Sequence, residues 1–508
     1  MQARRFHAVI WTMTEAALLA GFVALFSGCT VGPDFHRPAL PANAGYTARP
    51  LTATPSVANV PGGGQQRFVM GLEIPREWWA LFKSKPLDAL IERSLKKSPT
   101  IAAARAALRQ ARESVYAQAG AYYPVIQAAG SISRARDSGV ISPTPASNEE
   151  PYSLATAQVS VDYAPDIFGG NRRQVESLEA QANFQYFQLE AAYLALTSNV
   201  VAAAIQEASL RAQISATLKI IGVQTGMLGL LRRQLSLGYV AGADVAAQEA
   251  ALAQARQALP PLRRQLAQTR DLLAALAGGF PNGQMEEEFD LDSLVLPRAL
   301  PVSLPSRLVE QRPDVRAALA QLHAACAQIG VAASAQLPDI TLSADLGSTA
   351  ARIGRLFTAG TGLWSLAGNI AQTLFDGGAL RHRRRAAEAG LDLAEAQYRG
   401  TVIAAFQNVA DILHALKCDA DALKAAVDFE RASGRSLDLA RRQFELGYVN
   451  YLSLLSAEQS YQQAVINVVQ ARANRFADTA ALFMALGGGW WHNRDKVPEA
   501  QKNTLPCR

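Results

Sequence analysis

The chain of 508 residues contains one long internal repeat. The segment LLRRQLSLGYV at Leu230–Val240 recurs as LARRQFELGYV at Leu439–Val449, 209 positions later, with eight of eleven residues identical. A second pair of related segments is DIFGGNRR at Asp166–Arg173 and LFDGGALR at Leu374–Arg381. A unit of about 200 residues is far longer than a solenoid repeat of about 20–50 residues. The sequence therefore predicts a pseudo-two-fold fold made of two copies of one layout.

The first 28 residues have the organisation of a signal peptide. The basic residues Arg4 and Arg5 precede an apolar run of eleven residues, Ala16–Phe26, whereas a transmembrane helix needs about 20. Phe-Ser-Gly and then Cys29 follow at once, which resembles the bacterial lipobox. We expect Cys29 to carry diacylglycerol and palmitate, and Thr30 after it to direct the lipoprotein to the outer membrane. The alternative is an ordinary signal peptide with a coincidental cysteine.

Each copy contains two stretches in which apolar and polar residues alternate. The predicted strands lie at about 125–134 and 152–168 in the first copy, and at about 339–347 and 363–375 in the second. Alternation with a period of two gives a strand one apolar and one polar face. This pattern fits a half-buried sheet, and it equally fits barrel strands of about 9–11 residues that cross a membrane. The lipid anchor and the helices around the strands favour the barrel.

Two proline-free stretches of about 65 residues follow the strand pairs. They run from Asn171 to about Leu237 and from Ala379 to about Leu446. At 1.5 Å per residue each predicts about 100 Å of helix, which must pack against similar helices. The LGYV turns then reverse the chain into shorter helices at Asp244–Ala277 and Tyr451–Leu486. The tandem Pro260-Pro261 predicts a kink or break in the first of these.

Four strands in one chain are too few to close a barrel. Open sheet edges are not tolerated in lipid, and about eight strands is the smallest barrel that closes around filled space. The chain must therefore borrow strands from partners. Two chains would give eight strands and a plugged barrel, whereas three would give twelve strands and an aqueous pore.

Several short motifs carry a specific resemblance to a known family. They are CTVGPDF at Cys29–Phe35, Trp78-Trp79, RPDV at Arg312–Val315, LFDGG at Leu374–Gly378 and ALGGGWW at Ala485–Trp491. Over nearly its full mature length the chain resembles the TolC/OprM-like outer-membrane factors of the NodT subfamily of RND efflux lipoproteins. The resemblance implies an α+β membrane protein in which the helix–strand–strand–helix repeat is duplicated. It further implies a homotrimer whose twelve-stranded outer-membrane β-barrel continues into a long periplasmic α-helical barrel, with an equatorial domain.

The same resemblance implies a domain order and a set of partners. The expected segments are a lipoprotein signal peptide (1–28), an N-terminal equatorial segment (29–85), repeat 1 (86–280), an equatorial linker (281–300), repeat 2 (301–489) and a C-terminal tail (490–508). The partners would be a periplasmic adaptor (membrane fusion) protein, an inner-membrane RND-type transporter and outer-membrane lipid. The function would be a passive exit duct for drugs or other small molecules, which implies a part in multidrug resistance. The alternatives are the exit duct of a type I protein secretion system and a periplasmic coiled-coil scaffold.

In this family the gate lies just after the second turn, where an apolar ring adjoins acidic rings. The matching positions are Leu452 for the apolar ring, and Ser453 and Ser456 where relatives carry aspartate. Asp244, in the first turn, matches an acid that ties the two hairpins together. The two serines put a cation-selective carboxylate ring in doubt. Glu458 does not replace it, because it lies about 200° around the helix from Ser456.

The spacing after the second turn predicts which residues share the face of the gate. Leu452, Leu455, Ser456 and Gln459 follow the i, i+3, i+4, i+7 pattern of one helical face. We therefore expect them to point in one direction, with three copies of Leu452 forming the constriction. The alternative for Leu452 is ordinary packing between helices.

Catalytic, metal and nucleic-acid functions find no support in the residues. The six histidines form no HExxH or triad pattern, and no cysteine pair has the spacing of a metal site. The net charge of +6 is scattered rather than gathered in a basic tract. We expect Cys326 and Cys418 to be buried small apolar residues and Cys507 to lie in a frayed C-terminus.

Overall fold

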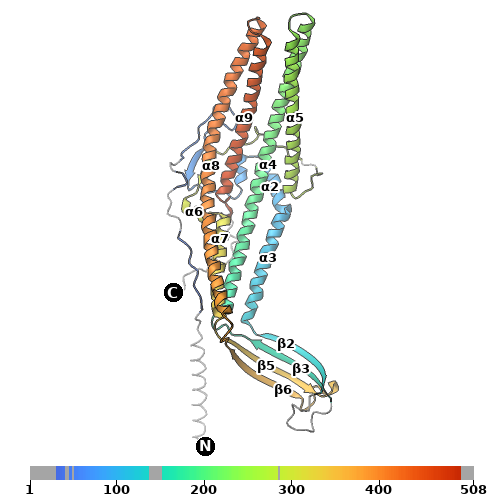
Figure 1. Cartoon of the computed structure of the whole chain (residues 1–508), viewed down its shortest axis with the longest axis vertical. Helices are drawn as coiled ribbons and strands as arrows, with labels where there is room; N and C mark the ends of the chain where they lie inside the picture. The colour runs from blue at the N-terminus through green and yellow to red at the C-terminus, as the bar shows by residue number, and fades with distance from the viewer. Residues whose placement is uncertain (1–29, 40–44, 48–50, 137–150, 284–285, 493–508) are drawn as a thin grey trace. The chain divides into compact units, whose positions relative to one another are not determined.

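The computed structural model describes residues 30–39, 45–47, 51–136, 151–283 and 286–492 (Figure 1). The chain divides into two compact units. The first comprises Met1–Arg37, Leu108–Gln185 and Ala318–Tyr398, and the second comprises Pro38–Ala107, Tyr186–Ala317 and Arg399–Arg508. Each unit thus takes nearly corresponding segments from the two repeats, as expected of a duplicated fold.

The first unit contains a four-stranded antiparallel sheet in the order β2-β3-β5-β6. The strands are β2 (Val125–Ala135), β3 (Tyr152–Tyr163), β5 (Asp339–Ala350) and β6 (Gly362–Ala371). All four predicted strands are therefore present. The predicted ends at residues 168, 347 and 375 are wrong, since β3 and β6 end earlier and β5 extends further.

Strands β3 and β6 end before the predicted residues for the same reason. In each repeat, an aspartate after the strand caps the following helix. The carboxylate of Asp166 accepts hydrogen bonds from the backbone amides of Asn171 (2.9 Å) and Arg172 (2.8 Å). In the second repeat, Asp376 accepts them from Gly378 (2.8 Å) and Leu380 (2.6 Å). These bonds satisfy free amides at or just before the first helical turn. The residues between strand and helix are therefore held in a turn.

The register of the sheet separates apolar from polar side chains. Residues paired across strands share one face. One cross-strand row on the first face consists of Ile126, Val161, Ala344 and Leu366, and the next consists of Ala128, Val159, Leu346 and Trp364. A row on the opposite face consists of Gln127, Ser160, Asp345 and Ser365. The sheet therefore has one apolar and one polar face. On the apolar face Leu366 is 78% and Trp364 79% exposed.

Long helices follow the sheet in both repeats, as the sequence predicts. Helix α4 (Gly170–Ser236) and helix α8 (Ala379–Glu445) have 67 residues each. The chain then turns into α5 (Gly242–Leu276) and α9 (Tyr451–Ala485), which have 35 residues each. The strands are preceded by α3 (Pro99–Ala119) and α7 (Pro313–Ser334).

The predicted break at Pro260-Pro261 is wrong, because α5 continues through both residues. A proline leaves the carbonyl four residues before it without a helical partner. Here those carbonyls belong to Arg256 and Gln257, and all four residues are exposed in the chain. Water can therefore replace the lost hydrogen bonds, so the helix persists.

The second unit contains a core that is built from the N-terminal segment, the linker between the repeats and helix α9. Strand β1 (Arg67–Met70) pairs in parallel with β4 (Ala299–Val302) of the linker region. Trp78 is fully buried and stacks on Phe483 of α9, with ring centroids 5.4 Å apart. The other described elements of this unit are α2 (Lys85–Lys97), α6 (Pro305–Gln311) and the 3₁₀ helices η1 (Trp78–Phe82) and η4 (Trp490–His492). The 3₁₀ helices η2 (Gly120–Tyr122) and η3 (Ile353–Arg355) belong to the first unit.

One buried arginine fastens the N-terminal segment to α9. Arg475 is 1% exposed and donates hydrogen bonds to the carbonyl oxygens of Gly62 (2.9 Å) and Gly64 (2.7 Å) and to Thr54 Oγ1 (3.0 Å). Burial lowers the pKa of Arg475. The donors of this one side chain thereby join the segment from Thr54 to Gly64 to α9.

By length and composition, two described helices, α4 and α7, are apolar enough to cross a membrane. The apolar window of α4 is only part of a helix of 67 residues. Core helices of water-exposed domains pass the same test, so this composition alone does not assign a span.

Candidate gate and N-terminal docking site

The two repeat-related turns have the same backbone geometry. At the α4–α5 turn, Tyr239 N donates to Gln234 O (2.9 Å) and Gly238 has φ of 79°. At the α8–α9 turn, Tyr448 N donates to Gln443 O (2.8 Å) and Gly447 has φ of 76°. These bonds and the left-handed glycine define a Schellman cap, which only glycine adopts without strain. The LGYV motif is therefore a helix stop, used once in each hairpin.

A buried tyrosine joins the two hairpins near these turns. Tyr451, the first residue of α9, is 2% exposed and packs with Leu228, Leu231 and Leu252 of the first hairpin. Its hydroxyl donates a hydrogen bond to Gln248 Oε1 of α5. Burial raises the pKa of Tyr451, so it stays a neutral donor. Gln224 Nε2 donates to Gln462 Oε1 (3.2 Å) and adds a second polar contact between the hairpins.

The predicted gate residues lie on the opposite side of α9 from this contact. Leu452 is 55% exposed, and Ser453 and Ser456 are exposed as well. The predicted inclusion of Leu455 in this face is wrong, because Leu455 is 7% exposed and packs in the cluster around Tyr451. The buried stripe of α9 is 451, 454, 455 and 458, at spacings of three and four. Leu455 belongs to that stripe, which the packing of Tyr451 against the first hairpin turns inward.

Asp244 lies in the first turn of α5. Its Oδ2 accepts a hydrogen bond from the amide of Ala241 (3.2 Å) at the start of the helix. Tyr451 with Gln248, and Gln224 with Gln462, make polar contacts between the hairpins, whereas this bond of Asp244 stays within its own hairpin. The family resemblance implies that Asp244 ties the two hairpins together, and this role stays a prediction.

Glu458 points into the protein. It is 1% exposed, and its Oε1 lies 3.4 Å from Arg441 Nη2 of α8. Burial raises the pKa of Glu458, and the Arg441 guanidinium partly opposes this shift. Glu458 therefore faces Arg441 and the interior, whereas Ser456 is exposed.

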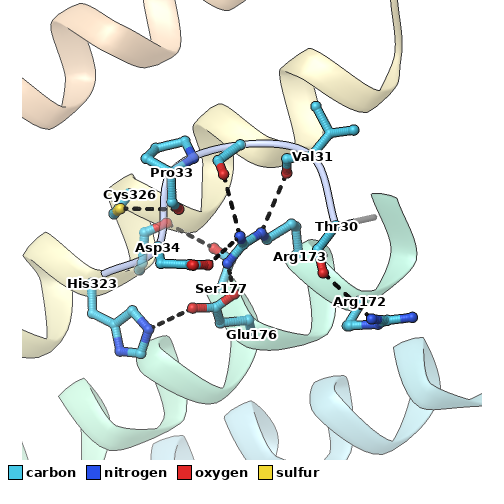
Figure 2. A network of polar contacts seen from close by, with 12 residues as sticks. Thr30, Val31, Pro33, Asp34, Arg172, Arg173, Glu176, Ser177, His323 and Cys326 are labelled. Carbon is cyan, nitrogen blue, oxygen red and sulfur yellow. Dashed lines mark hydrogen bonds and ion pairs between the residues drawn. The ribbon is translucent and has the colours of Figure 1, made fainter. Parts of the chain in front are cut away.

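A second cluster of polar contacts holds the segment that begins at Thr30 (Figure 2). Its central residue is Arg173 in the first turn of α4, which is 5% exposed. The guanidinium donates to Asp34 Oδ1 (2.6 Å) and Glu176 Oε2 (2.8 Å), and to the carbonyl oxygens of Val31 and Gly32 (both 3.4 Å). Arg173 was not among the residues predicted from sequence. Arg381 occupies the matching place in repeat 2 and is exposed, so the repeat alone did not single out Arg173.

Helix α7 supplies the other wall of this cluster. His323 Nε2 lies 2.8 Å from Glu176 Oε1, and the His323 ring stacks on Phe35 with centroids 4.3 Å apart. Hydrogen bonds from His323 and then Arg173 hold the pKa of Glu176 below its usual range, despite its partial burial. Cys326 Sγ lies 3.7 Å from the carbonyl oxygen of Pro33.

The cysteine predictions are confirmed in part. Cys326 is buried and Cys418 is exposed, so the expectation of burial is wrong for Cys418. Cys418 lies on an outward face of α8. Cys29 and Cys507 lie outside the described residues. Within the described ranges, no group of three histidine, cysteine or acidic residues is arranged to hold a metal ion.

A family model described as "Outer membrane efflux protein" matches residues 90–279 and 304–488. The chain belongs to this family. The two matched ranges correspond to the two copies of the internal repeat. The outer membrane efflux protein family therefore covers both sets of helices and strands.

Relatives with curated names resemble this outer membrane efflux protein over almost its full length. The probable efflux pump outer membrane protein TtgC of Pseudomonas putida is 29% identical over 499 residues, which cover 97% of this chain and 100% of TtgC. Outer membrane protein OprJ of Pseudomonas aeruginosa is 28% identical, with 94% of this chain and 96% of OprJ covered.

Solved structures of outer-membrane proteins share the fold. The outer-membrane channel OprN superposes with a TM-score of 0.81 at 27% identity, covering 91% of this chain and 100% of OprN. The outer membrane protein VceC of Vibrio cholerae gives 0.77 at 25% identity, covering 82% of this chain and 100% of VceC. The fold is therefore that of the TolC-like channels. The protein is an outer-membrane efflux channel and not an enzyme.

Proposed function

We propose that three copies of this chain form one channel with a twelve-stranded barrel in the outer membrane. The observation that carries the proposal is the four-stranded sheet, which has an apolar face and a polar face, and whose edge strands β2 and β6 each pair on one side only among the described residues. In lipid, both edges need partners, because unpaired backbone groups are costly there. Three sheets joined edge to edge supply these partners and leave a lumen. The apolar faces would then meet lipid, and the polar faces would line the pore.

The four hairpin helices would continue this channel into the periplasm. Helices of 67 residues, at about 100 Å, are on the scale needed to reach partners well below the membrane. We propose that a periplasmic adaptor and an inner-membrane RND-type transporter are those partners. The channel itself would be a passive duct, so the transporter would supply the energy.

The cargo we propose is small molecules rather than proteins. Related proteins are named for antibiotic efflux (ArpC), toluene efflux (TtgC) and pyoverdine export (OpmQ). These names favour a drug or metabolite pump over a type I protein secretion duct. A periplasmic scaffold is disfavoured, because such a protein has no use for a sheet whose apolar face is exposed.

The trimer can be tested by native mass spectrometry of the detergent-solubilised protein. We expect a mass of three acylated chains, and electron microscopy in nanodiscs should show one barrel per particle. A stable monomer in detergent-free buffer would contradict the barrel and favour the scaffold.

We also propose that Cys29 carries the lipid anchor. Cells grown with a palmitate analogue should label the wild-type protein, and the Cys29→Ser variant should lose the label. Because a barrel anchors the protein independently, this variant should lose targeting efficiency more than export. Equal labelling of both proteins would show that the signal peptide is an ordinary one.

A further inference from the structure

We propose that residues Thr30–Phe35 form an N-terminal latch, and that Arg173 is the residue that positions it on α4 and α7. The latch would hold the start of the mature chain against the folded first unit rather than leave it as a free tether. The part of this inference that concerns lipid rests on the proposed acylation of Cys29. The docking of the latch does not depend on it.

The charges around Arg173 indicate a built site rather than a chance surface contact. The Arg173 side chain is 6% exposed, whereas that of Asp34 is 79% exposed. Removing Asp34 would cost the latch one partner, but removing Arg173 would remove its three contacts with the latch at once. Hydrogen bonds between charged groups are roughly twice as strong as neutral ones. Glu176 holds the guanidinium in place from within α4 itself.

The latch also fits closely against α7. Gly32 has φ of 105°, and a Cβ atom there would lie 2.5 Å from the Cα atom of Gly330. A Cβ atom on Gly330 would in turn lie 2.9 Å from the carbonyl oxygen of Val31. The backbones therefore approach to a distance that only two glycines permit. Such mutual fit is expected of a docked segment and not of a flexible linker.

The latch begins where the sheet ends. Val31 N donates to the carbonyl oxygen of Phe168 (3.2 Å), and Arg172 Nη1 lies 3.4 Å from Thr30 Oγ1. Both partners belong to the junction between β3 and α4. One peptide bond separates Thr30 from residue 29, so a lipid on that residue would start within about 4 Å along the chain. The latch would thus deliver the acyl chains to the end of the sheet, at the depth where a barrel meets the periplasm.

The native thiol of Cys326 provides a reporter for this docking. Cys326 is 5% exposed and lies under Pro33 of the latch. We would purify the full chain with Cys418→Ser and Cys507→Ser, so that only Cys326 and any unacylated Cys29 can react with a maleimide. Mass spectrometry of the labelled peptides would identify the site. A thioether-linked diacylglycerol on Cys29 would block reaction there.

In the parent, Cys326 should label slowly. Arg173→Ala should raise the rate at least about tenfold, since labelling follows the fraction of molecules in which the latch is open. Asp34→Ala should give a smaller rise, and Arg173→Lys should fall between Arg173→Ala and the parent. Arg381→Ala, which removes the exposed arginine at the matching place in repeat 2, is the matched control and should label at close to the parent rate. Thermal unfolding is recorded in parallel, and an unchanged midpoint supports local opening.

Two results would overturn the latch. One is a rate at Cys326 that stays at the parent value in both Arg173→Ala and Asp34→Ala. The other is a rise in labelling that occurs only when the whole fold melts. Label on Cys29, with Cys326 still protected in the parent, would instead reject the lipid anchor and leave the docking supported.

Discussion

An arginine in place of Leu366 should prevent this protein from assembling in the outer membrane. Leu366 is 78% exposed on β6, in the apolar row that also contains Ile126, Val161 and Ala344. In a trimeric barrel this row would face lipid. An arginine near the middle of the bilayer costs about 2–4 kcal/mol in such barrels, and a trimer would bear this cost three times. We expect the trimer to disappear from purified outer membranes, as measured by native electrophoresis.

Asn369→Arg is the matched control for this prediction. Asn369 lies three residues further along the same strand and pairs with Thr341, so it belongs to the polar face. An arginine there would meet water in the lumen. Assembly should therefore stay near the wild-type level, with an effect on ion selectivity only. If Asn369→Arg abolishes the trimer and Leu366→Arg does not, the faces of the sheet are oriented the other way.

Much of the fold could be predicted because the same sequence pattern occurs at matching places in both repeats. The long helices were predicted within one residue at most ends, because proline-free stretches end at the LGYV motif in both copies. The four strands were also predicted, since apolar and polar residues alternate along each of them, most weakly in β6. The strand ends were less accurate. They depend on the hydrogen bonds of Asp166 and Asp376, which no periodic pattern encodes.

Two predictions, the helix break at Pro260-Pro261 and the exposure of Leu455, were wrong for the same reason. Both depend on whether a helix face is exposed or packed against a neighbour. Tandem prolines end a helix only where the freed carbonyls lack another partner, and those of α5 lie on an exposed surface. Leu455 was assigned to the exposed face because two overlapping stripes both satisfy the helical spacing. Only the packing of Tyr451 against the first hairpin decides between them.

The N-terminal docking site could not be predicted, because its parts are far apart in the sequence. Arg173 lies 139 residues from Asp34, and His323 lies 147 residues from Glu176. The CTVGPDF motif was recognised as part of a family signature, but the signature alone gives no reason for its glycine and aspartate. The structure provides one, since Gly32 allows close approach to Gly330 and Asp34 pairs with Arg173.

Shortening Leu452 should make the closed channel leak. Leu452 projects from the exposed side of α9 directly after the second turn, whereas Tyr451 beside it holds the hairpins together. In a trimer, three leucines at one level would form an apolar ring that excludes water, a known way to close a pore without charge. Leu452→Ala should raise single-channel conductance in planar bilayers several-fold. It should also sensitise cells to bulky antibiotics.

Two comparison variants show whether the apolar ring itself is the barrier. Leu439→Ala shortens another exposed leucine of the same hairpin, on α8, and should leave conductance unchanged. Ser456→Asp adds three carboxylates one turn from Leu452, so it should increase cation selectivity and introduce block by divalent cations. The competing explanation is that contacts between hairpins keep the channel shut. In that case Leu452→Ala would conduct like the wild type, and Tyr451→Phe would open the pore, because it removes the hydrogen bond to Gln248 of the first hairpin without changing the apolar ring. Asp244→Ala would open the pore as well if Asp244 ties the hairpins together, as the family resemblance implies.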